Sequence, residues 1–464
     1  MRALALSLLL AAAASGEAIE AAAGKTEITP DPSRELVWMA GYGTGRRATG
    51  VHDPLWARAV AFRSNGTTVV IVALDLVGYF RPEVEKIRSI LPKKLGVTHL
   101  VVCCTHNHEG PDTMGLWGPI PFVSGVKREY MTKVRTTVIR LVEQVVGELR
   151  PARLKMAETT APVDGVVGDH RDPVIFDDTL SVMGIDDAAD GAPIATLVNW
   201  ACHPETLGSK NTQLTSDYPH ALREAVEAET GGVCVFLSGA LGGMMTPEPP
   251  SGLEDFEAAR HVGESVGKAA VKALEGAKGV EEAAVEVRTK TIDVPVENKS
   301  YRLGMLTGTL KRDVYDEEGN LFEGSVLGRS KLFVRTEVSM FRIGEAQFIT
   351  VPGELLPELA VGAYDGSRSH GRDIVGKGNP NPPKLADAPK GPYLRDRMTG
   401  RVKFLIGLAN DELGYIIPPY NFERNDRSPI HQPEPPGDHY EETNSLGIEA
   451  APRIVGALEE LLAE

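Results

Sequence analysis

The chain has 464 residues, of which 42% are hydrophobic and 24% are charged, and its formal net charge is −15. This length and composition are ordinary for a folded globular chain with a substantial core. The acidic charge and the lack of a basic stripe argue against nucleic-acid binding and against a polybasic attachment to anionic lipid.

The N-terminal segment has the three parts of a secretory signal peptide. Arg2 provides a positive start, the run from Ala3 to Ala14 is almost wholly apolar, and small residues follow. The run is too short to cross a bilayer comfortably. We therefore expect a leader over residues 1–23, cleaved between Ala14 and Ala23, and a secreted or periplasmic location. The mature domain over 24–464 should have no membrane span. A buried N-terminal helix is the alternative.

Strands and helices alternate along the rest of the chain. Apolar, β-branched runs predict strands at 56–63, 68–75, 98–105, 153–159, 178–184, 193–200, 233–238, 283–295, 332–343 and 345–351. Apolar residues at helical spacing predict helices at 82–93, 128–149, 218–229, 253–275 and 446–463. This alternation is typical of the α/β class, in which helices cover a layered mixed sheet. No composition break divides the chain, so we expect a single large catalytic domain.

Four cysteines lie in apolar, strand-like runs, at Cys103, Cys104, Cys202 and Cys234. They are too few for a disulfide framework, and their spacing differs from the CxxC pattern that zinc–thiolate sites prefer. A buried thiol packs as a small hydrophobic group. We therefore expect all four cysteines in the core.

One predicted strand ends in two histidines that are two residues apart. His106 and His108 follow the apolar run at 98–105, and Gly110 and Pro111 then turn the chain. Side chains at positions i and i+2 of an extended chain share a face, about 7 Å apart. The two imidazoles can therefore share a metal ion, or one can bind a metal while the other handles a proton. Two solvated loop histidines are the alternative.

Two further strand ends add possible metal ligands. His203 closes the apolar run in LVNWACHPETLG (197–208), and Glu354 follows another in FITVPGELLPE (348–358). Zinc in a catalytic site usually takes three protein ligands and keeps a position open for water. Two histidines and a carboxylate fit that requirement. The alternative for Glu354 is a carboxylate that interacts with a helix N-terminus.

Six short motifs follow one another as they do in the neutral, non-lysosomal ceramidase family. They are THNHEGP (105–111), NWACHPETLG (199–208), GGMMTP (242–247), VPGE (351–354), LANDELGYIIPP (408–419) and HYEETNS (439–445). Together they span roughly residues 24–450, and the chain resembles the N-terminal catalytic domain of that family. We expect the family's further C-terminal β-sandwich domain to be absent, which leaves ceramide itself open as the substrate.

The resemblance implies a zinc (Zn²⁺) site and its ligands. By position in the motifs, the ion would be held by four side chains, those of His106, His203, Glu354 and Tyr415. The family often has a further tyrosine where this chain has Glu412.

The resemblance also implies four catalytic positions. His108 would lie beside the zinc-bound water, and Arg171 and Tyr440 would contact the substrate near the scissile amide. Thr246 stands where the family has a serine, and its catalytic role is left open.

These features predict a zinc-dependent hydrolase that cleaves an N-acyl amide bond by attack of a zinc-bound water. The expected partner is a small-molecule or lipid-like N-acyl substrate. Two alternatives remain: a zinc hydrolase of esters or non-lipid amides, and a catalytically silent binding protein with the same fold. The sequence leaves the oligomeric state open.

Overall fold

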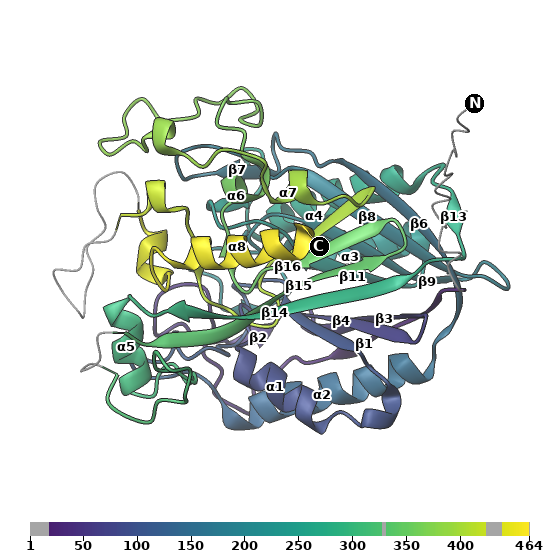
Figure 1. Cartoon of the computed structure of the whole chain (residues 1–464), viewed down its shortest axis with the longest axis horizontal. Coiled ribbons are helices and arrows are strands. Elements are labelled where there is room, and N and C mark those ends of the chain that lie inside the picture. Colours follow the sequence, from purple (N-terminus) through teal and green to yellow (C-terminus); the bar gives the residue numbers. More distant parts are fainter. Residues whose placement is uncertain (1–17, 327–330, 424–438, 464) are drawn as a thin grey trace, which may run out of the picture.

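The computed structural model describes residues 18–326, 331–423 and 439–463. Two β-sheets form its centre, and helices cover their outer faces (Figure 1). Most of the predicted leader, residues 1–17, lies outside the described residues. No helix in the described ranges combines the length and apolarity that a membrane crossing requires.

The larger sheet has nine strands within the described residues, in the order β11-β9-β8-β6-β1-β3-β4-β5, with β13 paired to β6. The strands pair both in parallel, as β4 with β5 and β9 with β11, and antiparallel, as β3 with β4. Their bounds are β1 Glu20–Glu27, β3 Trp56–Ser64, β4 Thr67–Leu74, β5 His99–Cys104, β6 Arg150–Thr160, β8 Thr179–Asp187, β9 Pro193–Trp200, β11 Val233–Ser238 and β13 Gly279–Val280.

The smaller sheet has the order β14-β15-β16-β18 and packs on one face of the larger sheet. Its strands are β14 Val285–Pro295, β15 Phe333–Ile343, β16 Ala346–Thr350 and β18 Val402–Ile406. Three phenylalanines of this sheet stack in the shared core, with ring centroids 4.6 Å apart for Phe341–Phe348 and 4.4 Å for Phe348–Phe404. Burying each ring contributes roughly 1.5–3 kcal/mol.

Helices cover the outer face of each sheet. On the larger sheet these are α1 Arg81–Ile90, α2 Arg128–Gly147, α3 Tyr218–Thr230 and α4 Asp255–Leu274. On the smaller sheet α8 Ala450–Ala463 crosses β14 and β15, with α6 Pro357–Val361 and α7 Leu394–Arg397 beside it (Figure 1). The predicted α/β architecture, a mixed sheet covered by helices, is confirmed.

Neighbouring cysteines illustrate how the strands divide the core. Cys103 packs between the two sheets, whereas Cys104 packs beneath α1 and α2, because successive side chains of a strand point to opposite faces. All four cysteines are buried free thiols, as expected.

Several elements differ from the sequence prediction. Strand β1 is composed mostly of small residues and starts at Glu20, inside the predicted leader. Strand β18 has only five residues and was not predicted, and the same holds for helix α5 Lys299–Leu306. The remaining short strands are β2 Gly50–Val51, β7 Val167–Asp169, β10 Gln213–Leu214, β12 Met245–Pro247, β17 Glu354–Leu355 and β19 Tyr415–Ile416.

Two buried asparagines connect the sheets where the strands end. The side-chain amide of Asn199, on β9, donates to the carbonyl of Leu405 at 2.8 Å and accepts from the N–H of Leu405 at 3.0 Å. The side-chain oxygen of Asn410 accepts from the N–H of Val102 on β5 at 2.8 Å, and the backbone N–H of Asn410 donates to the carbonyl of Val102 at 2.7 Å. These bonds bring the carboxyl ends of β5, β9, β16 and β18 together, and the segments that follow these ends carry the predicted metal ligands.

Candidate metal centre and its pocket

Three buried histidines converge beyond these strand ends. The ring centroids of His106 and His203 are 5.0 Å apart, and those of His108 lie 4.8 Å from His106 and 5.7 Å from His203. Each offers a nitrogen atom within 4.8 Å of the others, and the three residues are 0–8% exposed. The structure therefore brings together side chains that lie almost 100 positions apart in the sequence, in an arrangement that could hold a metal ion.

The backbone at His106 is not the extended strand that the sequence suggested. Strand β5 ends at Cys104, and His106 has a φ of 66°, in the left-handed region that side chains other than glycine rarely adopt. The prediction of two histidines on one strand face is therefore wrong in its geometry. The bend, rather than strand pleating, brings the imidazole of His106 beside that of His108. Such a conformation costs of order 1–3 kcal/mol and is typical of functional sites.

Hydrogen bonds to the backbone set the tautomers of two of these histidines. Nδ1 of His106 lies 2.7 Å from the carbonyl oxygen of Val77, and Nδ1 of His203 lies 2.9 Å from that of Met245. A carbonyl oxygen can only accept, so each Nδ1 carries a hydrogen and, in the neutral ring, each Nε2 keeps its lone pair. Carbonyl partners of this kind orient metal-binding histidines in proteins.

Glu354 completes the group. Its Oε2 lies 3.1 Å from Nε2 of His203 and 3.3 Å from Nε2 of His106. With both rings neutral, three electron-rich atoms face one another, and only a proton or a cation relieves their repulsion. The donor set of two imidazoles and one carboxylate fits zinc.

The pKa shifts describe the state in which a proton takes that place. Burial lowers the pKa of His203, but its hydrogen bond with Glu354 and the nearby carboxylate charges raise it to about 9. Burial raises the pKa of Glu354, yet the positive charge and hydrogen bonds of His106 and His203 hold it well below its usual range. The site is therefore built to stabilise positive charge among these three side chains.

His108 has a different environment. Its Nδ1 lies 3.3 Å from Oε2 of Glu205, and the ring of Tyr42 packs edge-on with a centroid distance of 5.3 Å. Burial lowers the pKa of His108 to about 4, although Glu205 opposes the shift. The ring is therefore neutral at pH 7 and can accept a proton.

Glu205 is a charged group buried beside the histidines. Burial raises its pKa, but the hydrogen bond and charge of His108 outweigh this effect and lower it to about 2. The side chain of Thr246 also hydrogen-bonds to Glu205, and Thr246 is not among the residues that line the pocket. The threonine thus contacts the site through Glu205, rather than facing a substrate directly.

A pocket of about 610 Å³ opens at His106, His108 and Glu354. Part of its wall is apolar, formed by Met114, Leu116 and Trp117, and this part can accommodate a hydrocarbon chain. The other lining residues are Gly41, Tyr42, Gly43, Thr44, Val77, His106, His108, Glu205, Met244, Tyr301, Glu354, Glu412, Gly414, Tyr415, Tyr440 and Asn444.

Both tyrosines predicted for the site line this pocket. Strands β17 and β19 pair in parallel and place Tyr415 opposite Glu354, and the Tyr415 hydroxyl donates to Sδ of Met244 at 3.4 Å. Tyr440 is 37% exposed, with its ring centroid 6.3 Å from that of Tyr415. A thioether is a weak acceptor, so the Tyr415 hydroxyl can readily exchange this partner for another.

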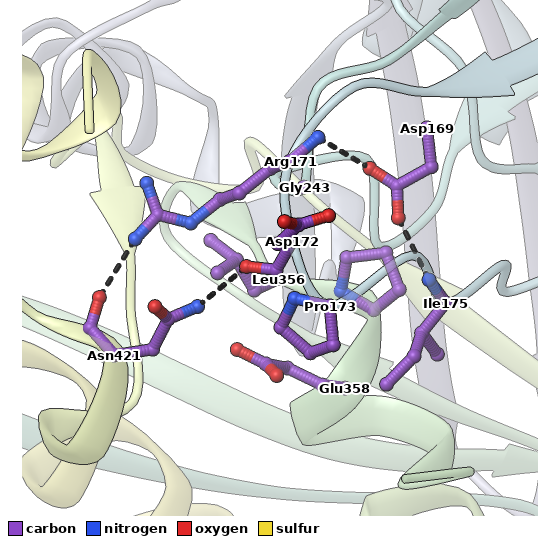
Figure 2. A pocket seen from close by; sticks show the side chains of 10 residues that line it. Asp169, Arg171, Asp172, Pro173, Ile175, Gly243, Leu356, Glu358 and Asn421 are labelled. Carbon is purple, nitrogen blue, oxygen red and sulfur yellow. Dashed lines mark hydrogen bonds between the residues drawn. The ribbon is translucent and has the colours of Figure 1, made fainter. Parts of the chain in front are cut away.

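Arg171 is not among the residues that line this pocket, and its predicted substrate contact stays a prediction. Its guanidinium donates to Glu441 at 2.5 Å, to Glu442 at 2.9 Å and to the carbonyl of Asn421 at 2.7 Å. Figure 2 shows it beside a separate small cavity, with Asn421 on one side and Asp169 on the other. The two carboxylates that follow Tyr440 in the sequence hold the guanidinium through charge-assisted hydrogen bonds, which are strong.

Sequence reasoning missed four pocket residues. Glu205 follows His203 in the HPE motif, Glu412 was noted only as a departure from the family pattern, and Tyr42 lies in the glycine-rich stretch GYGTG (41–45). The glycines of that stretch were a usable signal, since a Cβ on Gly41 would lie 2.4 Å from the side chain of His108. Tyr301 has no distinguishing sequence context.

Glu412 faces the pocket from the segment that precedes Tyr415. It is 3% exposed, and its Oε1 accepts a hydrogen bond from the N–H of Gly414 at 2.8 Å. Burial raises the pKa of Glu412 well above its usual range, and the negative charge of Glu354 raises it further. A cation held by Glu354 would offset this second effect.

Comparison with known proteins places this geometry on a known fold. The chain superposes on the crystal structure of neutral ceramidase from Pseudomonas aeruginosa with a TM-score of 0.66 and 17% sequence identity, over 96% of this chain and 73% of that one. A solved ceramidase complexed with C2 gives the same TM-score and identity, and the match covers 74% of that chain. No family model and no curated protein sequence matches the chain.

The chain therefore has the neutral ceramidase fold, and its buried histidine cluster could bind a metal ion at a pocket. The resemblance to the ceramidase catalytic domain that the six motifs suggested is confirmed at the level of the fold.

Proposed function

We propose that this chain is a zinc-dependent hydrolase that cleaves an N-acyl amide bond. The ion would be held by Nε2 of His106, Nε2 of His203 and the carboxylate of Glu354, with the hydroxyl of Tyr415 as a fourth ligand. The observation that carries the proposal is the convergence of two imidazole lone pairs and a carboxylate oxygen within 3.3 Å, at the base of a pocket.

A divalent cation bound there would supply an electrophile for the substrate carbonyl and lower the pKa of a water molecule to near 7. His108 accepts the proton that this water loses and returns it to the leaving amine. Glu205, 3.3 Å from Nδ1, holds the ring in place and stabilises the imidazolium while it carries the proton. Tyr440 donates its hydroxyl hydrogen to the carbonyl oxygen as negative charge develops.

Two residues support this set without touching the substrate. Arg171 binds Glu441 and Glu442 and so fixes the segment that carries Tyr440. Thr246 hydrogen-bonds to Glu205 and so helps to orient His108. We therefore assign positioning roles to both residues.

The apolar part of the pocket and the likeness to neutral ceramidase favour a lipid-like N-acyl substrate. Esters and non-lipid amides would use the same groups and are the alternative substrates. A silent binding protein is the other alternative, and the unrelieved set of acceptors around Glu354 argues against it.

The test is hydrolysis by zinc-loaded protein of a panel of N-acyl lipids, N-acyl amino acids and esters of matched chain length. We expect amide cleavage that a chelator abolishes and added zinc restores. Cleavage of esters alone would favour the second alternative. Stoichiometric zinc without any cleavage would support the silent protein.

We also propose export through the N-terminal leader. Ala18 forms a bridge to Glu282, and Ile19 is buried in the core shared by the two sheets, directly before β1. A cut at or before residue 17 leaves these contacts whole, which favours the early part of the expected window. N-terminal sequencing of secreted protein tests this, and a mature chain starting at 24 would contradict it.

A further inference from the structure

A methionine lies in the pocket wall beside the candidate metal centre. Met244 lines the pocket and has a φ of 59°, a backbone conformation that side chains other than glycine rarely adopt. Its side chain packs against the cluster of Leu356, Tyr415 and Ile417. Its Sδ accepts the hydrogen bond from the Tyr415 hydroxyl at 3.4 Å. The sulfur therefore contacts the tyrosine that is proposed as the fourth metal ligand.

The sulfur of Met244 is also unusually accessible. Met244 and Met305 are half-buried, whereas the other methionines of the described ranges are at most 8% exposed. These are Met39, Met114, Met131, Met156, Met183, Met245, Met340 and Met398. Met305 lies on α5, outside the set of residues that line the pocket, and all four cysteines are buried. Because oxidation follows exposure, a small oxidant that enters the pocket reaches Met244 first.

Oxidation changes the hydrogen bond that this sulfur accepts. A thioether is a weak acceptor, whereas its sulfoxide is a polar group whose oxygen carries partial negative charge. That oxygen accepts from a hydroxyl as strongly as a carbonyl oxygen does. The difference between a weak and a full hydrogen bond corresponds to about 2- to 10-fold in an equilibrium constant.

We propose that Met244 is a modification site at which oxidation regulates the metal centre. A lone pair of Sδ attacks one oxygen of hydrogen peroxide, the O–O bond breaks, and an S–O bond forms. The departing hydroxide takes the proton of the new S–OH group and leaves as water, so the sulfur loses the two electrons that the peroxide gains. The sulfoxide oxygen then competes with the metal ion for the Tyr415 hydroxyl. The proposal rests on the proposed function and adds regulation of the same site.

Zinc affinity before and after oxidation tests the proposal. Metal-free protein is treated with hydrogen peroxide, oxidised residues are located by peptide mass spectrometry, and zinc is titrated in competition with a chromophoric chelator. We expect sulfoxide at Met244 ahead of all other methionines, and a zinc Kd about 2- to 10-fold higher. Methionine sulfoxide reductase with dithiothreitol, removed before titration, should restore the original Kd, because two thiols become a disulfide and the oxygen leaves as water.

Two variants isolate the sulfur that responds. Met244→Leu keeps an apolar side chain of similar volume without the thioether, so peroxide should leave the zinc Kd of this variant unchanged. Met305→Leu, the same change at the other half-buried methionine, should keep the response of the unmodified protein. A response that persists in Met244→Leu would overturn the proposal.

Measuring zinc binding beside hydrolysis separates this proposal from the proposed function. A peroxide-dependent rise in Kd that requires Met244, in protein that cleaves no amide, would sustain the modification site and remove the hydrolase. Sulfoxide at Met244 with an unchanged or lower zinc Kd would overturn the proposal and leave the hydrolase in place. Oxidation confined to other methionines would overturn it as well.

Discussion

Two buried clusters of charged side chains, one around Arg171 and one around Glu354, differ in how their charges are balanced. Around Arg171, one guanidinium meets the carboxylates of Glu441 and Glu442 at 2.5–2.9 Å. Around Glu354, two imidazole Nε2 atoms and a carboxylate oxygen meet without any permanent cation. In the first cluster a guanidinium supplies donors to both carboxylates, whereas the second cluster requires a proton or an ion.

The difference teaches how to tell a structural cluster from a ligand site. Both contain residues that family motifs mark as functional, and both are buried. Burial and motif membership therefore do not distinguish them. Counting donors against acceptors does so, because an internal ion pair needs no ligand whereas converging acceptors need one.

The largest effect should follow removal of a metal-site histidine. His106→Ala and His203→Ala each delete one of two imidazole ligands, so we expect loss of stoichiometric zinc and of all hydrolysis. Metal content after dialysis, measured by mass spectrometry, checks this. His170→Ala, at an exposed position, is the matched control and should retain zinc. Full zinc occupancy in either of the first two variants would show that the deleted histidine is not a required ligand. It would then contradict the distinction between the two clusters.

The next effect concerns His108. His108→Ala should retain zinc and lower kcat by about 10²- to 10⁴-fold, the usual contribution of a general acid–base group. The paired measurements are zinc content and turnover. If zinc is lost instead, all three histidines are ligands, and another group must carry the proton.

Arg171→Ala should act on stability and leave zinc in place. The substitution leaves the carboxylates of Glu441 and Glu442, each 1% exposed, without their cationic partner. Breaking a buried pair typically costs about 3–5 kcal/mol of unfolding free energy. Denaturant unfolding measures the loss. Arg372→Ala, which breaks a half-exposed pair with Glu248, should cost less than about 1 kcal/mol. Zinc loss from Arg171→Ala would instead show that the Arg171 cluster supports the zinc site and is not separate from it.

The same variant should show a characteristic pH dependence. Burial raises the pKa of Glu441 to about 7 even beside Arg171, and loss of the arginine raises it further. The folded variant then binds a proton that the unfolded chain, with an ordinary carboxyl pKa, releases. Its unfolding free energy should therefore recover as the pH falls from about 8 to about 5. A defect that stays constant across this range would exclude stranded carboxylates as its cause.

The smallest effect should come from Thr246→Ala. The threonine reaches the site only through Glu205, so we expect zinc retention and a loss in kcat of about 10-fold or less, the worth of one hydrogen bond. Complete inactivation with zinc retained would instead indicate that the threonine hydroxyl takes part in the chemistry.

The sequence predicted the location of the candidate metal centre better than its geometry. Apolar runs ending at His106, His203 and Glu354 marked three strand ends, and their side chains together fit the ligand requirement of zinc. The left-handed backbone conformation at His106 could not be predicted from the sequence, because no glycine marks the position.

Long-range partners account for the remaining differences. The carboxylates that bind Arg171 lie about 270 positions away, so its motif could not reveal that they hold it away from the pocket. Strand β18 is short and was obscured by the motif that follows it, although its pairing with β16 and Asn199 aligns the Tyr415 segment. The positions of Glu205 and Glu412 in the pocket could be recognised only from their neighbours in the structure.

A crystal structure of zinc-loaded protein, with anomalous scattering recorded at the zinc edge, tests the central claim most directly. We predict one strong peak bounded by Nε2 of His106, Nε2 of His203 and the carboxylate of Glu354, and none at the Arg171 cluster. Density without a peak at that position, in protein that carries stoichiometric zinc, would contradict the account.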